Sequence, residues 1–262
     1  MSRQILGSLI ILILFTGGLA GCQGTKTRLR QAESHYEYGM LYLQNGKYNL
    51  AYREFEKARK LNPKDHRLYH GLGLINYFQG NFSSAIREYQ RAIDLNQTYP
   101  DAYNNMAAAL AKLEQWPEVI QYADKALAIP SYATPEFAHY NKGIAYFNLG
   151  EYERARIEFE ISLELDPTYI DTHYQLGLVL LKLASYSRAA DAFERVLQLI
   201  PMVGEGQDDS LIVNSHYYLG LSRFENNEIE RAVGEFQKVI ELAPESRRAQ
   251  EAWQYLNTIK VE

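Results

Sequence analysis

The chain has 262 residues, of which 27 are basic and 32 acidic, and its formal net charge is −5. No run of Lys and Arg is long enough to grip a phosphate backbone, which argues against a nucleic-acid partner. The one cysteine, Cys22, excludes an internal disulfide and any metal site built from several cysteines.

Residues 1–21 have the composition of a secretory signal. Arg3 provides a positive start, residues 5–15 are strongly apolar, and the sequence Leu-Ala-Gly-Cys ends at Cys22. The apolar stretch is about half the roughly 20 residues that a membrane-spanning helix needs, so we exclude residues 1–21 from the predicted fold. Leu-Ala-Gly-Cys resembles the lipobox of bacterial lipoproteins, in which the cysteine receives diacylglycerol and becomes the mature N-terminus. The alternative is an N-terminal anchor that is not cleaved, with Cys22 as a bystander.

The lipobox resemblance implies a permanent lipid anchor at Cys22, because several acyl chains bind a membrane far more strongly than one. Gln23 stands where Asp retains such lipoproteins in the inner membrane. The resemblance therefore implies the outer membrane of a Gram-negative bacterium, with the protein facing the periplasm. Residues 22–31 are then expected to form a short, polar, lipidated tether.

A pattern with a period of 34 residues runs through the rest of the chain. Gly39, Gly46, Ala51, Phe55 and Ala58 recur as Gly73, Gly80, Ala85, Tyr89 and Ala92, and related copies follow Gly143, Gly177 and Gly220. This spacing is the tetratricopeptide repeat (TPR) signature. The chain resembles TPR proteins over most of its length, which implies an all-α, right-handed superhelical solenoid of helix-turn-helix repeats.

Six repeats are predicted, at residues 32–65, 66–99, 100–133, 136–169, 170–203 and 213–246. The third is degenerate, since Ala107, Val119 and Ala123 replace the usual glycine, alanine and aromatic residue. Residues 204–212 are polar, contain two glycines, and are predicted to form a loop. Residues 247–262 carry apolar side chains at helical spacing, and we expect a helix that caps the last repeat.

The repeated residue types are those that packing requires. Glycine at the eighth position and alanine at the twentieth are expected where the two helices of a repeat approach closely. The large residue at the twenty-fourth position, such as Phe55 or Phe193, is expected to fill the space between repeats.

No catalytic or metal-binding set can be assembled. His35, His139, His173 and His216 share one repeat position, but equivalent positions in stacked helices lie roughly 10 Å apart, too far for a shared metal ion. We interpret them as packing residues that replace an aromatic side chain. Glu54, Glu56, Glu88 and Glu158 are interpreted as a solvated convex face. We expect no cofactor, no metal and no small-molecule substrate, and an enzyme is the least favoured class.

In TPR proteins the first helix of each repeat lines a concave groove, at about its second, fifth, ninth and twelfth positions. The fifth positions are Tyr36, His70, Asn104, Tyr140, Tyr174 and Tyr217; the ninth are Met40, Leu74, Ala108, Ile144, Leu178 and Leu221; the twelfth are Leu43, Tyr77, Ala111, Phe147, Leu181 and Phe224. Only His70 and Asn104 are clearly polar. An apolar stripe of this extent predicts a binding surface for an amphipathic helix or an apolar peptide. The alternative is that tight coiling buries the stripe between adjacent first helices.

Six TPRs behind a lipobox resemble the type IV pilus biogenesis and stability lipoproteins, the pilotins. The resemblance is carried by residues 32–55, by Tyr-Asn-Asn-Met at 103–106, and by residues 132–143 with their two-residue insertion. It implies a non-enzymatic scaffold that is anchored through Cys22 and holds the secretin subunit while that subunit inserts into the outer membrane and multimerises. The alternative is a general envelope adaptor that recruits peptidoglycan enzymes or serves outer-membrane protein assembly.

Overall fold

The computed structural model describes residues 3–203 and 209–259, with side chains described for residues 24–201 and 209–259. Within these ranges the regular structure is α-helical, without strands. The helices are α1 (Arg3–Gln44), α2 (Tyr48–Leu61), α3 (His66–Phe78), α4 (Phe82–Leu95), α5 (Pro100–Lys112), α6 (Trp116–Leu127), α7 (Pro135–Asn148), α8 (Tyr152–Leu165), α9 (Ile170–Lys182), α10 (Tyr186–Val203), α11 (Asp209–Glu225), α12 (Ile229–Leu242) and α13 (Arg247–Ile259).

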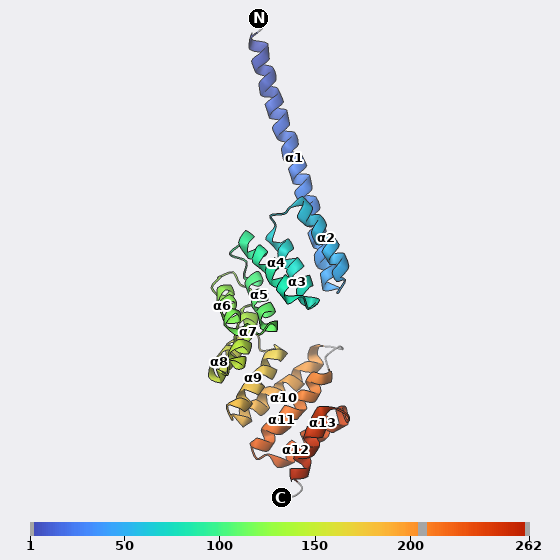
Figure 1. The fold of residues 1–262 in the computed structure, drawn as a ribbon, viewed down its shortest axis with the longest axis vertical. Coiled ribbons are helices and arrows are strands. Elements are labelled where there is room, and N and C mark those ends of the chain that lie inside the picture. The colour runs from blue at the N-terminus through green and yellow to red at the C-terminus, as the bar shows by residue number, and fades with distance from the viewer. Residues whose placement is uncertain (1–2, 204–208, 260–262) are drawn as a thin grey trace. The chain divides into compact units, whose positions relative to one another are not determined.

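Figure 1 shows successive helices turning back on one another as hairpins. Each of the six predicted repeats contains one pair of consecutive helices, and α13 follows the sixth pair as the predicted capping helix. These findings confirm the all-α fold of six repeats and a cap. The chain divides into two compact units, unit 1 (Met1–Leu113) and unit 2 (Glu114–Glu262).

Close packing of the two helices in a repeat explains why the spacing of glycine and the aromatic residue recurs from repeat to repeat. A Cβ atom added to Gly39 would lie 2.5 Å from Phe55 Cδ1, and one added to Gly177 would lie 2.6 Å from Phe193 Cζ. Gly73, Gly143 and Gly220 have the same relation to Tyr89, Phe159 and Phe236. A Cβ atom added to Gly71, in the next repeat, would lie 2.6 Å from Phe55 Cζ. Phe55 therefore fills the space between repeats, as predicted.

The turn inside each repeat contains one residue in the left-handed backbone conformation. Three turns use glycine, namely Gly46, Gly80 and Gly150, and three use Glu114, Ala184 and Asn227. A residue in the left-handed conformation ends a helix while the last carbonyl groups keep hydrogen bonds, but any residue with a Cβ atom is strained in that conformation. The three side-chain-bearing residues all belong to unit 2.

The structure corrects two expectations about linkers. Of the predicted loop at residues 204–212, residues 209–212 instead form the first turn of α11, and residues 204–208 lie outside the described residues. The predicted tether at residues 22–31 is part of the long helix α1, and its side chains from Gly24 to Arg30 are all exposed.

The predicted signal segment and the lipidation residue Cys22 lie at the start of α1, where side chains are outside the described set. Among the residues searched, no helix combines the length and the apolar character needed to cross a membrane.

Candidate functional site

The predicted groove residues are half-buried rather than open to solvent. All eighteen lie within the described side chains, and none is classed as exposed. Leu43, His70, Asn104 and Tyr217 are buried, and the others are intermediate. The stripe is therefore partly covered, which lies between the open binding surface and the buried stripe that the sequence leaves as alternatives.

One part of the stripe remains hollow. In unit 2 a cavity of about 570 Å³ is lined by Phe147 from α7, Leu178 and Leu181 from α9, and Leu221 from α11. The remaining lining residues are Lys182, Tyr186, Tyr218, Glu225 and Tyr255. This volume falls within the range of about 300–1,000 Å³ that is typical of ligand pockets. We call this the unit 2 cavity.

Two opposite charges stand among the apolar residues of the unit 2 cavity. Lys182 and Glu225 are both exposed, and each follows the twelfth position of its repeat. Both stand at the thirteenth position, which is not among the positions from which the groove is predicted. They give the cavity a cation and an anion that can orient a ligand with complementary charges.

The inner face of unit 1 has a different chemistry, which centres on His70. The Asn105 side-chain amide lies 2.7 Å from His70 Nε2, and the Tyr99 hydroxyl lies 2.9 Å from His70 Nδ1. Since an amide nitrogen can only donate, Nε2 accepts and Nδ1–H donates to Tyr99. Burial, with a smaller effect of His66, lowers the pKa of His70 to about 4, so the ring is neutral at pH 7.

Arginines bridge two helices at both ends of the repeat array: α3 to α1 at one end, and the capping helix α13 to α11 at the other. Arg67 donates to both carboxylate oxygens of Glu33, at 3.0 and 2.6 Å, and its guanidinium lies 4.4 Å from the ring centre of Tyr36. Arg248 donates to Asn214 at 2.8 Å and lies 4.5 Å from the ring centre of Tyr217.

Each of these arginines is 34 residues from its polar partner; Arg67 is the second residue of the second repeat, and Arg248 is the second residue of the capping helix. That spacing is a sequence signal which could have predicted both bridges. The arginines cover the predicted groove tyrosines, and this explains part of the burial of the stripe.

Three of the four repeat-position histidines bind a glutamate of the same repeat. His35 Nδ1 lies 2.6 Å from Glu54, and His139 Nδ1 lies 2.7 Å from Glu158. The equivalent pair in the sixth repeat is His216 with Glu235, at 2.6 Å.

These pairs overturn two interpretations of the sequence. The histidines are not simple replacements for an aromatic residue, because they join the two helices of a repeat through a hydrogen bond. Glu54 and Glu158 are not on a solvated face, because their side chains are only 15% and 12% exposed. His173 lacks such a partner because Ala192 occupies the glutamate position; its Nε2 lies 3.0 Å from the Pro167 carbonyl oxygen instead. Among the described residues no group of three or more His, Cys, Asp and Glu is placed to hold a metal ion.

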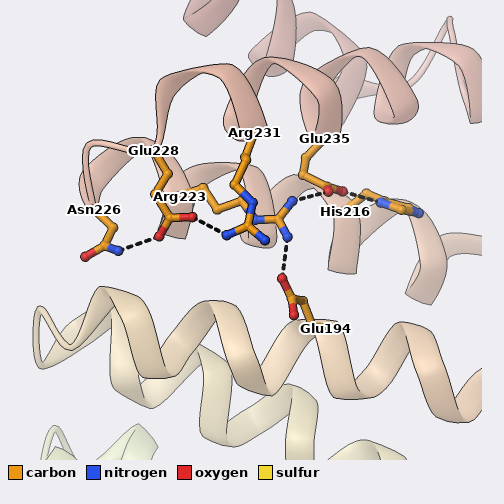
Figure 2. A network of polar contacts seen from close by, with 7 residues as sticks. All are labelled: Glu194, His216, Arg223, Asn226, Glu228, Arg231 and Glu235. Carbon is orange, nitrogen blue, oxygen red and sulfur yellow. Dashed lines mark hydrogen bonds and ion pairs between the residues drawn. The ribbon is translucent and has the colours of Figure 1, made fainter.

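Figure 2 shows a polar network that joins α10, α11 and α12. The buried Arg223 donates to Glu194 of α10 and to Glu235 of α12, and Glu235 also contacts His216. Each carboxylate is thus held by a guanidinium or an imidazole group. This arrangement pairs the buried Arg223 with two carboxylates between the fifth and sixth repeats, which is a structural role.

The sequence matches the tetratricopeptide repeat family over well over half of its length. Matches described as TPR repeat or tetratricopeptide repeat cover residues 32–65, 77–114, 136–169 and 174–247. The chain belongs to the tetratricopeptide repeat family, whose members are protein-interaction modules.

Several solved structures have a fold similar to that of this chain. The fold is similar to that of PilW, described as a widely conserved type IV pilus biogenesis factor, with a TM-score of 0.74, 20% identity, and coverage of 85% of this chain and 98% of PilW. It is also similar to PilF of Pseudomonas aeruginosa, with a TM-score of 0.75, 20% identity, and coverage of 86% and 97%. YrrB, described as a TPR protein with an unusual peptide-binding site, has a TM-score of 0.59 at 20% identity, with coverage of 76% and 97%. No curated protein sequence matches significantly.

Proposed function

We propose that this protein is a lipid-anchored scaffold for type IV pilus biogenesis that binds the secretin subunit in the unit 2 cavity and promotes its insertion and multimerisation in the outer membrane. The observation that carries the proposal is the coincidence of the unit 2 cavity with four residues predicted to bind a partner, namely Phe147, Leu178, Leu181 and Leu221. Cys22 would carry the lipid, and the chain would face the periplasm.

The likeness to PilW supports the pilus context. That protein is described as a type IV pilus biogenesis factor, and almost all of its chain is covered by the match. The structural likeness to YrrB, described as having a peptide-binding site, supports a peptide as the kind of ligand. A non-enzymatic role agrees with the family, because TPR modules act by holding other proteins.

The cavity lining indicates the chemistry of the bound segment. Aliphatic and aromatic side chains form most of the lining, so a ligand gains affinity by burying its own apolar residues there. Lys182 and Glu225 add one charge of each sign. An amphipathic helix with apolar residues on one face and charges beside them fits this surface.

The binding test uses three leucines at the same repeat position. Leu178 and Leu221 line the unit 2 cavity, whereas Leu74 occupies the ninth position in unit 1. We expect Leu178→Ser and Leu221→Ser each to weaken secretin binding about 30-fold, since a central apolar contact contributes about 2 kcal/mol. Leu74→Ser is the matched control and is expected to bind within about twofold of the unaltered chain.

The measurement is the affinity of each purified variant for the secretin subunit, with helical content checked by circular dichroism. Equal affinity of the Leu178→Ser and unaltered chains would reject the cavity as the site. In cells, deletion of the gene is expected to remove secretin multimers. Loss of pili with normal multimers would instead favour the general envelope adaptor.

The anchor has its own test. Mass spectrometry of the mature protein is expected to show an N-terminal Cys22 carrying acyl chains. An unmodified Cys22 would contradict the proposed anchoring without bearing on the cavity.

A further inference from the structure

The first repeat and the segment before it carry a charge opposite to that of the whole chain. Residues 24–65 contain nine Lys or Arg and five Asp or Glu, whereas the complete chain has more acidic than basic residues. An asymmetry of this size within one domain indicates a surface that meets a negatively charged partner.

The fold gathers these cations at one end of the first repeat. α2 runs antiparallel to α1, so its last turn lies beside the part of α1 near Gln31, away from the turn at residues 45–47 (Figure 1). A hollow of about 460 Å³ at this end is lined by Gln31, Ser34, His35, Lys57, Lys60 and Leu61. Lys26, Arg28 and Arg30 lie on the next turns of α1, and Lys64 follows the end of α2.

Nearby carboxylates do not neutralise this end. Arg67 holds Glu33 and Asp65 at 2.6 Å each, and Glu54 is held by His35 and Lys57. Five further cations are exposed and form no ion pair with another described residue: Lys26, Arg28, Arg30, Lys60 and Lys64. We call these five residues the cationic end.

We propose that the cationic end binds the headgroups of anionic phospholipids and holds the first repeat against the membrane surface. The inference rests on the lipid anchor of the proposed function, because α1 continues from the cationic end towards Cys22. At 1.5 Å per residue, Gln31 is about 14 Å along the helix from Cys22, and Lys26 is about 6 Å from it. These lengths are comparable to the Debye length of about 10 Å at 0.1 M salt, so the cations lie within reach of the surface charge.

A membrane surface suits this geometry better than an acidic protein does. The cations are spread over two helices and a loop at the end of the repeat nearest the anchor, and a fluid layer of headgroups can adapt to such an arrangement. The result would be a defined orientation of the first repeat relative to the bilayer, in place of free rotation about a tether.

The experiment measures lysine reactivity of the full-length lipoprotein in vesicles. The protein is reconstituted in phosphatidylcholine alone or in phosphatidylcholine with phosphatidylglycerol, treated with an amine-acylating reagent, and analysed by mass spectrometry. We expect acylation of Lys60 and Lys64 to be slowed at least about fivefold by the anionic lipid at low salt, and to recover at high salt. Lys125 and Lys238, which are exposed in unit 2, are expected to react equally in both vesicles.

A charge-neutral variant separates the headgroup surface from the anchor. Each cation near an anionic surface contributes about fivefold to binding, so Arg28→Gln with Arg30→Gln is expected to abolish most of the about fivefold protection of Lys60. The matched control replaces two exposed arginines of unit 2, Arg231→Gln with Arg247→Gln, and keeps full protection.

Equal acylation of Lys60 in the two vesicle types would overturn the inference, as would unchanged protection in the Arg28 and Arg30 variant. Flotation of the protein with both vesicle types reports the anchor instead. The proposed lipid anchor and the proposed headgroup contact are therefore tested by different measurements.

Discussion

The inner faces of unit 1 and unit 2 use the same repeat positions for different purposes. At the fifth position unit 1 has the buried His70, which is bound by Tyr99 and Asn105, whereas unit 2 has tyrosines such as Tyr174. At the ninth position Leu178 of unit 2 lines a cavity of about 570 Å³. At these positions unit 1 presents a hydrogen-bonded polar network around His70, and unit 2 offers an apolar hollow.

This difference separates stacking from binding. The glycine and the aromatic residue that hold the two helices of a repeat together are equivalent in both units, as Gly39 with Phe55 and Gly177 with Phe193 show. The distance between the glycine and the aromatic ring is nearly the same in the two units, although the inner faces differ. Residues that build the repeat therefore carry no information about the ligand, which depends on the positions that vary.

The largest expected effect comes from removing a core aromatic residue in each unit. Phe193 and Phe55 are both fully buried, so Phe193→Ala and Phe55→Ala are each expected to lower the free energy of unfolding by about 3–5 kcal/mol. The measurement is urea unfolding followed by circular dichroism. The two variants should be similarly destabilised because the two side chains fill equivalent spaces.

The same pair of variants also tests the contrast between the units. The Phe193 ring stacks on Tyr218 with ring centres 5.6 Å apart, and Tyr218 lines the unit 2 cavity. Phe193→Ala is expected to weaken secretin binding, whereas Phe55→Ala should leave binding unchanged at a temperature where both variants are folded. Loss of binding in Phe55→Ala alone would place the site in unit 1. A conservative Phe193→Leu is expected to recover part of the stability and of the binding.

Sequence periodicity predicted the fold well because the repeat imposes the same packing six times. Each predicted repeat contains its helix pair, and the cap at residues 247–262 appears as α13, with residues 260–262 outside the described part. The 34-residue spacing also places Glu33 and Arg67 at equivalent positions of successive repeats, where they form a bridge.

The exposure of the inner face was beyond sequence reasoning. Whether Leu178 borders a hollow depends on the relative placement of α7, α9, α11 and α13, and no single repeat encodes that placement. The glutamate partners of the histidines were missed for a related reason. His35 and Glu54 are 19 residues apart on different helices, so their contact follows from the hairpin and not from helical spacing.

A pH titration sharpens the description of unit 1. The unfolded chain binds a proton at His70 with an ordinary pKa near 6.5, but in the folded state burial lowers the pKa of His70 to about 4. The unfolded state therefore takes up the proton first, and the stability contributed by neutral His70 is lost as the pH falls from about 6.5 towards 4. Between pH 7 and pH 4.5 this residue is expected to lower the free energy of unfolding by about 2 kcal/mol.

The measurement compares urea unfolding of the unaltered chain with that of His70→Gln at both pH values, so that the titration of other groups cancels. Glutamine keeps a donor and an acceptor for Tyr99 and Asn105 and does not titrate. His173→Gln serves as the control, because His173 is only partly buried and should show a smaller dependence. If His70→Gln loses as much free energy of unfolding as the unaltered chain on acidification, the buried neutral histidine is not the cause of that loss. Resonances of the His70 ring that shift near pH 6.5 would contradict the same idea directly.

The smallest expected effect concerns the turns, where the units also differ. Both turns of unit 1 use glycine in the left-handed conformation, whereas unit 2 places Ala184 there with φ of +53°. Ala184 is exposed, so its methyl group contributes no core packing, and it strains the turn. Ala184→Gly is expected to raise the free energy of unfolding by about 0.5–1 kcal/mol, the strain relief being offset in part by the entropy of glycine in the unfolded chain. The reverse change at the equivalent turn, Gly150→Ala, is expected to lower the free energy of unfolding by about 1 kcal/mol, since Gly150 has φ of +76°.

The affinity of Ala184→Gly for the secretin subunit is expected to stay within about twofold of that of the unaltered chain, because glycine keeps the turn that positions the neighbouring Tyr186 at the unit 2 cavity. A stabilised variant with weakened binding would instead show that the strained turn is part of the binding surface of unit 2, which unit 1 lacks.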